Sequence, residues 1–196
     1  MRARKIHPRL LGKRRLRSEA HRVQTRVSPS IKRLASRIPG KGVASVKQLA
    51  NLVFKKTPVR ESVENHNNRF RRTAADIAIK KHVDLLHCYE RCHLMISALA
   101  AKEIPAWIVV EMDWQNFMHT YVEAMVGKEI YTIAFRTYEP PIVKKGTVEK
   151  AVEHAPGSSF VRGLDMGDLG VTNEKTFRLF AEKLRHGKVK GSIELK

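Results

Sequence analysis

Cys88 and His119 are the two side chains of this sequence best suited to chemistry on a substrate. Cys88 stands at the start of a predicted helix over residues 88–102, where the positive end of the helix dipole favours a thiolate. His119 opens a predicted strand and could supply the base that a thiol nucleophile needs. Taken alone, composition and spacing favour a structural pair instead, a small buried cysteine and a histidine at a strand edge.

The residues around Cys88 also suggest a zinc site, because His87, Cys88, Cys92 and His93 are crowded together. Structural zinc sites usually take paired ligands separated by a longer loop, and ligands packed around one helix start cannot all face one ion. We therefore expect no metal. Thiol chemistry requires no organic cofactor either.

Hydrophobic periodicity predicts helices first and strands afterwards. The expected elements are a helix from Ala44, helices over 73–81 and 88–102, strands over 106–112, 119–126 and 129–135, and helices over 147–154 and 173–186. A long glycine-rich loop separates the last two helices. This order predicts an α+β fold, with N-terminal helices packed on a small antiparallel sheet.

A set of motifs runs through residues 73–135, about a third of the chain. They are the short segment Thr73–Asp76, Cys88 with the small Cys92 four residues later, Leu94 and Leu99, the turn Glu103-Ile104-Pro105-Ala106, the strand residues Ile108-Val109-Val110, the segment His119-Thr120-Tyr121-Val122-Glu123, Gly127, and Tyr131-Thr132-Ile133. In spacing and residue type they resemble the core of the transglutaminase-like superfamily, the papain-related cysteine enzymes.

The resemblance implies a cysteine peptidase, amidase or acyltransferase that acts on amide or peptide bonds, with Cys88 as nucleophile and His119 as its partner. One departure concerns the third residue of the site, because Ala134 stands where the family has an Asp. That Asp orients the imidazole. Glu123 lies about 13 Å along the strand from His119, at ~3.3 Å per residue. Asp113 and Glu139 are the other carboxylates that could reach the imidazole, from loops.

An oxyanion site needs hydrogen-bond donors near the attacked carbonyl. The backbone N–H of Cys88 is one candidate donor. The side chains of Gln115, Trp114 and Asn116, in the loop before His119, are the others.

Positive charge is concentrated at the N-terminus. Residues 1–72 contain 21 Lys and Arg against three acids, whereas residues 73–196 contain 17 against 16. We expect residues 1–43 to form a basic, flexible arm and residues 44–196 a single transglutaminase-like α+β domain. The arm's candidate nucleic-acid-binding residues are Arg2, Arg4, Lys5, Arg9, Lys13, Arg14, Arg15 and Arg17.

The alternative function follows from this charge. The domain would be an inactive transglutaminase-like scaffold whose residues 1–72 bind RNA, DNA or the ribosome by neutralising phosphates. A solvated tail and an organelle transit peptide are the competing interpretations of the arm. No apolar run approaches the ~18 residues of a membrane helix, and no secretory signal is visible, so the expected compartment is the cytoplasm.

Overall fold

Five strands form the antiparallel sheet around which the chain is built, in the order β7-β6-β5-β4-β8. They are β4 (Ala106–Met112), β5 (Met118–Val126), β6 (Glu129–Ala134), β7 (Ile142–Lys145) and β8 (Ser159–Gly163). Gly127 adopts a φ of 64° in the tight turn between β5 and β6, a conformation that glycine takes without steric cost. The structure is a computed structural model that describes residues 4–5, 24–60, 72–80, 83–84, 88–113, 115, 117–191 and 193–194.

The two faces of this sheet bury different clusters of side chains. On one face Ile108, Val110 and Val122 pack against α5 (Cys88–Ala101). On the other face Trp107, Val109 and Tyr121 form a smaller cluster together with Val148 of α6 (Val148–Ala151). Side chains alternate along a strand, so every residue of β4 and β5 belongs to one face or the other.

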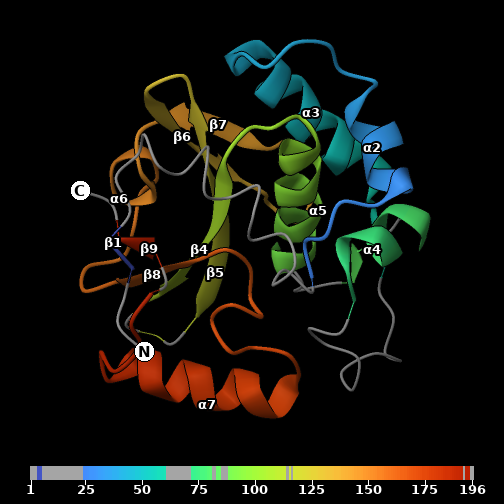
Figure 1. Ribbon diagram of the computed structural model, residues 1–196. Coiled ribbons are helices and arrows are strands. Elements are labelled where there is room, and N and C mark those ends of the chain that lie inside the picture. The colour runs from blue at the N-terminus through green and yellow to red at the C-terminus, as the bar shows by residue number, and fades with distance from the viewer. Residues whose placement is uncertain are drawn as a thin grey trace.

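Three helices pack against α5 on its side away from the sheet (Figure 1). They are α2 (Pro29–Ala35), α3 (Val43–Lys56) and α4 (Ala74–Lys80). Each turns an apolar stripe inward, as Ile31 and Ala35 do from α2. As a result α5 is buried from Tyr89 through Leu99, between the sheet and the three helices.

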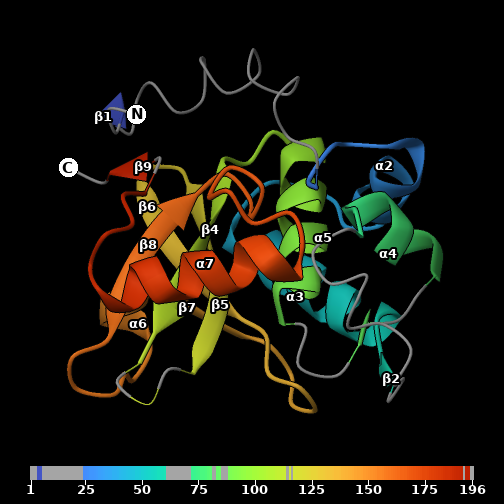
Figure 2. The same cartoon turned by 90° about the horizontal axis from the view of Figure 1, so that it is seen from below.

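The C-terminal part adds the amphipathic helix α7 (Glu174–Arg185), which packs next to β4 (Figure 2). Asn173 caps α7 by accepting a hydrogen bond from the Thr176 backbone N–H. Two short parallel pairs complete the described structure. They join β1 (Arg4–Lys5) to β9 (Ile193–Glu194) and β2 (Val59–Arg60) to β3 (Val83–Asp84).

The expected α+β class is confirmed, with helices preceding an antiparallel sheet. Several differences concern segments expected to lack regular structure. One is the edge strand β7, which pairs with β6 between the strand expected over 129–135 and the helix expected over 147–154. The helix α2 lies inside residues 1–43, so the described part of the expected arm from Gln24 onward is folded, with Ile31 and Ala35 buried. The edge strand β8 occupies the loop that was expected before the last helix, because it pairs with the buried strand β4.

Within the described residues no helix combines the length and the apolar character needed to cross a bilayer.

Candidate functional site

A cleft of about 690 Å³ opens beside the start of α5, at the last residues of β4 and β6 and the first residues of β5. Its lining includes Cys88, Glu111, His119, Tyr121, Ala134 and His154. The structure therefore brings both residues of the expected thiol pair, and the alanine at the expected third position, to one cavity.

Cys88 is the first residue of α5 and is partly exposed in this cleft. Its sulfur accepts a hydrogen bond of 3.0 Å from the Thr120 hydroxyl of β5. The thiol is thus held against the sheet at the N-terminal end of a helix, where the helix dipole stabilises negative charge.

Cys92, one helical turn further on, has a different environment. Its side chain is fully buried, and its sulfur lies 3.5 Å from the backbone oxygen of Thr120. Burial raises the pKa of the Cys92 thiol, with the neighbouring Cys88 adding to the effect. Cys92 accordingly stays protonated and fills the core, as its small-residue position in the sequence pattern indicates.

His119 is exposed on β5 and borders the same cleft. Its side chain belongs to the sheet face of Tyr121, whereas its neighbour Thr120 belongs to the face of α5. At the start of β5, Cys88 therefore reaches the cleft from the α5 face of the sheet, and His119 reaches it from the opposite face.

Ala134 lies on β6 directly opposite Tyr121, so β6 offers no carboxylate at this position. A carboxylate is present instead on β4, where Glu111 lies opposite His119 in the β4–β5 register. Sequence reasoning missed this pairing. The signal was an acidic residue within an otherwise apolar strand, residues 106–112.

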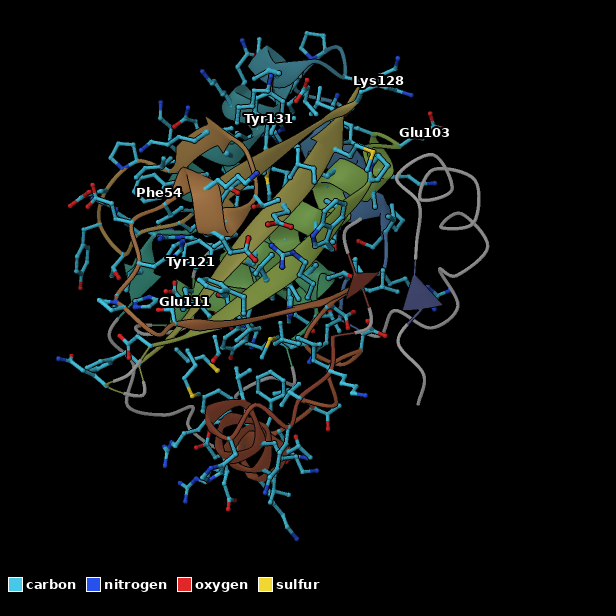
Figure 3. The ribbon with its side chains drawn as sticks, turned by 90° about the vertical axis from the view of Figure 1, so that its left-hand side faces the viewer. Phe54, Glu103, Glu111, Tyr121, Lys128 and Tyr131 are labelled. Carbon is cyan, nitrogen blue, oxygen red and sulfur yellow. The ribbon has the colours of Figure 1, made fainter. Side chains whose placement is uncertain are left out.

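Glu111 is buried and has two partners among the residues that line the cleft, one of which, Tyr121, is labelled beside it in Figure 3. The Tyr121 hydroxyl donates to Glu111 Oε2 across 2.7 Å, and His154 Nδ1 lies 2.9 Å from Glu111 Oε1. The other ring nitrogen of His154 lies 2.7 Å from the backbone oxygen of Val148. Burial and the hydrogen bond to Glu111 raise the pKa of Tyr121, which therefore remains a donor.

The candidate oxyanion residues are only partly placed. Gln115 is exposed in the turn between β4 and β5 and is not among the residues that line the cleft. Trp114 and Asn116 lie outside the described residues. The Cys88 backbone N–H, in the first turn of α5, is the donor that the described structure retains.

The remaining candidate residues concern nucleic-acid binding and zinc. Among the basic residues expected to bind nucleic acid, Arg4 and Lys5 form β1, and Arg2, Arg9, Lys13, Arg14, Arg15 and Arg17 lie outside the described residues. His87 of the possible zinc group also lies outside them. Within the part of the chain that is described, no three His, Cys, Asp or Glu side chains are grouped to hold a metal ion.

Comparison with known proteins gives a partial likeness in fold. No family model matches the chain, and no curated protein matches it. A solved structure of a candidate cysteine protease from Cytophaga hutchinsonii is similar over 70% of this chain and 48% of its own, at 18% identity and a TM-score of 0.45. The structure of a transglutaminase (TGase) is similar over 92% of this chain and 53% of its own, at 16% identity and a TM-score of 0.39.

The chain thus spans about half the length of each of these two proteins. Its own described elements carry the assignment of fold: a helix that begins at Cys88, then β4, then β5 with His119, then β6. This is the α+β order that the transglutaminase-like resemblance implies.

Proposed function

We propose that this protein is a cysteine enzyme that acts on amide or peptide bonds, with Cys88 as nucleophile and His119 as proton carrier. The observation that carries the proposal is the contrast between the two cysteines. Cys88 is accessible in a cleft that also contains a histidine, whereas Cys92 is sealed in the core.

The proposed reaction has two steps. The Cys88 sulfur forms a bond to the amide carbonyl carbon, the carbon–nitrogen bond breaks, and the thiol proton passes through His119 to the leaving amine. Water or a second amine then attacks the acyl-enzyme, releases the acyl group and returns a proton to the thiolate. The first acceptor gives hydrolysis and the second gives acyl transfer.

The cleft lining suits a polypeptide substrate. Apolar side chains such as Phe117, Met118 and Ile142 lie beside charged ones such as Arg136 and Glu153. Phe117 is 62% exposed at the rim, a large apolar surface that is available to a substrate side chain.

Acylation by a small activated ester tests this function. Purified protein is treated with p-nitrophenyl acetate, and acetylated peptides are quantified by mass spectrometry. We expect acetyl on Cys88, its loss in Cys88→Ser, and a slowing of about 10²-fold or more in His119→Ala. His186→Ala changes an exposed histidine at the end of α7 and is the matched control. Equal rates in His119→Ala and wild type would reject the Cys–His pair.

A second candidate function, nucleic-acid binding, is favoured by one observation on the folded N-terminal helices. Residues 24–60 contain no Asp or Glu. Eight of their basic side chains are exposed: Arg26, Lys32, Arg33, Arg37, Lys41, Lys47, Lys55 and Lys56. Lys41 pairs with Glu103, and the other seven form no ion pair with any described residue. Exposed basic side chains in such number, with no acidic residue among them in sequence, attract the phosphates of a nucleic acid.

Binding of the full chain to a duplex DNA and a duplex RNA, followed by fluorescence anisotropy at several salt concentrations, tests this second function. The variant Lys32→Gln/Arg37→Gln/Lys47→Gln should lower the slope of log K against log salt by about 0.9 for each lost phosphate contact on DNA. Its control, Lys175→Gln/Lys183→Gln/Arg185→Gln, removes the same charge from exposed positions of α7. Equal losses in both variants, or no loss in either, would reject nucleic-acid binding through Lys32, Arg37 and Lys47.

A further inference from the structure

Glu111 is a charged residue in an unusual place. It lies in β4, where all seven residues are buried, and its own exposure is 3%. A carboxylate in such a strand is costly unless its oxygens are satisfied. Tyr121 and His154 each contact one of its two oxygens, whereas an ionised carboxylate offers about four acceptor positions. Acceptor capacity toward the cleft therefore remains.

The register places this carboxylate beside His119. Glu111 and His119 are directly opposite each other on adjacent antiparallel strands, so their side chains leave the same face of the sheet. The Cβ atoms of such a pair are about 4.5–5.5 Å apart. A glutamate and a histidine can hydrogen-bond across that separation.

The other carboxylates near the cleft have other roles or lie too far away. Asp113 Oδ1 accepts from the Phe117 backbone N–H and closes the β4–β5 turn. Glu139 pairs with Arg136 at 2.5 Å on the surface. Glu153 lines the cleft but is exposed, and solvent weakens its pull on an imidazole.

Glu123 lies on the same sheet face as His119, four residues along β5, or about 13 Å at ~3.3 Å per residue. Its oxygens are engaged by Trp107 Nε1, by the Val148 backbone N–H and by both Nε and Nη2 of Arg162. Glu123 therefore has a structural role, because it holds Trp107, Val148 and Arg162 together.

We infer that Glu111 is the positioning residue that orients His119, in the role that Ala134 cannot fill; this inference rests on the proposed function of the Cys88 site. In this role Glu111 would accept a hydrogen bond from one ring N–H of His119, a bond that is not formed among the described contacts of Glu111, and the second ring nitrogen would face the cleft. The carboxylate also stabilises the imidazolium that forms when His119 takes the thiol proton. Tyr121 and His154 hold the carboxylate in place.

A double-mutant cycle on Cys88 acetylation tests the inference. Glu111→Gln preserves the side-chain size, and we expect it to slow acetylation at least about tenfold in the wild-type background. In the His119→Ala background the same substitution should change the rate less than about twofold, because the residue through which Glu111 acts is absent. An equal effect in both backgrounds, or no effect in either, would overturn the inference.

Glu123→Gln is the matched control, because it makes the same substitution at a buried carboxylate on the same sheet face. It should lower the free energy of unfolding measured in urea. Its effect on Cys88 acetylation should be the same in the wild-type and His119→Ala backgrounds. Failure of the proposed function has a different signature, namely wild-type protein that is not acetylated on Cys88. Acetylation of wild type and Glu111→Gln at equal rates rejects only the role of Glu111.

Discussion

The hydroxyl of Thr120 donates to the sulfur of Cys88 across 3.0 Å, from the β5 position that directly follows His119. One contact thus ties the start of α5 to the strand that carries the proposed proton carrier. The position of the nucleophile depends on a side chain of the sheet as well as on its own helix.

Thr120→Val tests this contact, because it preserves the side-chain shape and removes the hydroxyl. An O–H donor stabilises a negatively charged sulfur, so we expect alkylation of Cys88 by iodoacetamide to slow about two- to tenfold, the worth of one hydrogen bond. Thr137→Val, at another threonine of the cleft lining, is the control. Unchanged alkylation in Thr120→Val would contradict the expectation.

The two cysteines should differ sharply in reactivity. Because burial raises the pKa of Cys92 and closes access to it, iodoacetamide should modify Cys88 alone in the native protein. Both should react once urea unfolds the chain. Peptide mass spectrometry after a short exposure measures the two separately. Comparable native reaction at Cys92 would show that the core around α5 opens readily.

Removing Arg162 should be far more harmful than removing an exposed arginine. Arg162 donates from Nε and Nη2 to the fully buried Glu123, each at 2.9 Å. Arg162→Met leaves that charge unpaired and should lower the free energy of unfolding by about 3–5 kcal/mol. Arg178→Met breaks an i,i+4 pair with Glu174 in which the arginine is 78% exposed, with an expected cost within about 0.5 kcal/mol. Urea denaturation compares them, and similar losses would contradict the prediction.

His93 should make the fold sensitive to mild acid. Burial lowers the pKa of His93 to about 4, against an opposing influence of Asp165 and Glu90. The unfolded chain binds a proton below about pH 6.5 whereas the folded chain does not. The free energy of unfolding should therefore fall as pH drops from about 6.5 toward 4, by at most about 1.4 kcal/mol per pH unit from this residue.

The substitution His93→Gln should reduce the slope of unfolding free energy against pH by up to about 1.4 kcal/mol per pH unit, the contribution of one proton. Glutamine retains an acceptor for the Met166 backbone N–H, which lies 3.5 Å from His93 Nε2. Urea titrations at several pH values between about 5 and 7.5 measure the slope. A variant with the full wild-type slope would show that other groups cause the acid sensitivity.

Ala134→Asp should act as a rescue. It restores a carboxylate where the sequence resemblance places one, opposite Tyr121 and one position diagonal to His119. In Glu111→Gln protein we expect it to recover much of the lost Cys88 acetylation, at some cost in stability because Ala134 is only 6% exposed, beside Trp107 and Val109. No recovery in a variant that folds normally would contradict this expectation.

Local pattern was sufficient to predict much of the sheet. The alternation in residues 119–126 indicates that Thr120, Val122, Ala124 and Val126 share a face, and Val122 and Ala124 do pack in the core with α5. The helix start at Cys88 likewise follows from periodicity and is observed. These features depend on neighbours in sequence, which is why they could be predicted.

The features that were missed depend on distant contacts. The proposed role of Glu111 depends on the register of β4 with β5. This register is fixed only when the turn between the two strands forms. The helix α2 has only seven residues, too few to be stable alone, and its stability comes from packing against α4 and α5. Neither relationship can be derived from composition or local spacing.

Arg91 connects three segments that are far apart in the chain. From within α5 it donates to the backbone oxygens of Thr57, Arg136 and Thr137, and its guanidinium lies 4.7 Å from the centre of the Phe54 ring. We therefore expect the end of α3, the helix α5 and the loop after β6 to unfold together as one cooperative unit. In native-state hydrogen exchange their slowest amides would share a single opening free energy, and replacing this one arginine would divide the unit into separate parts.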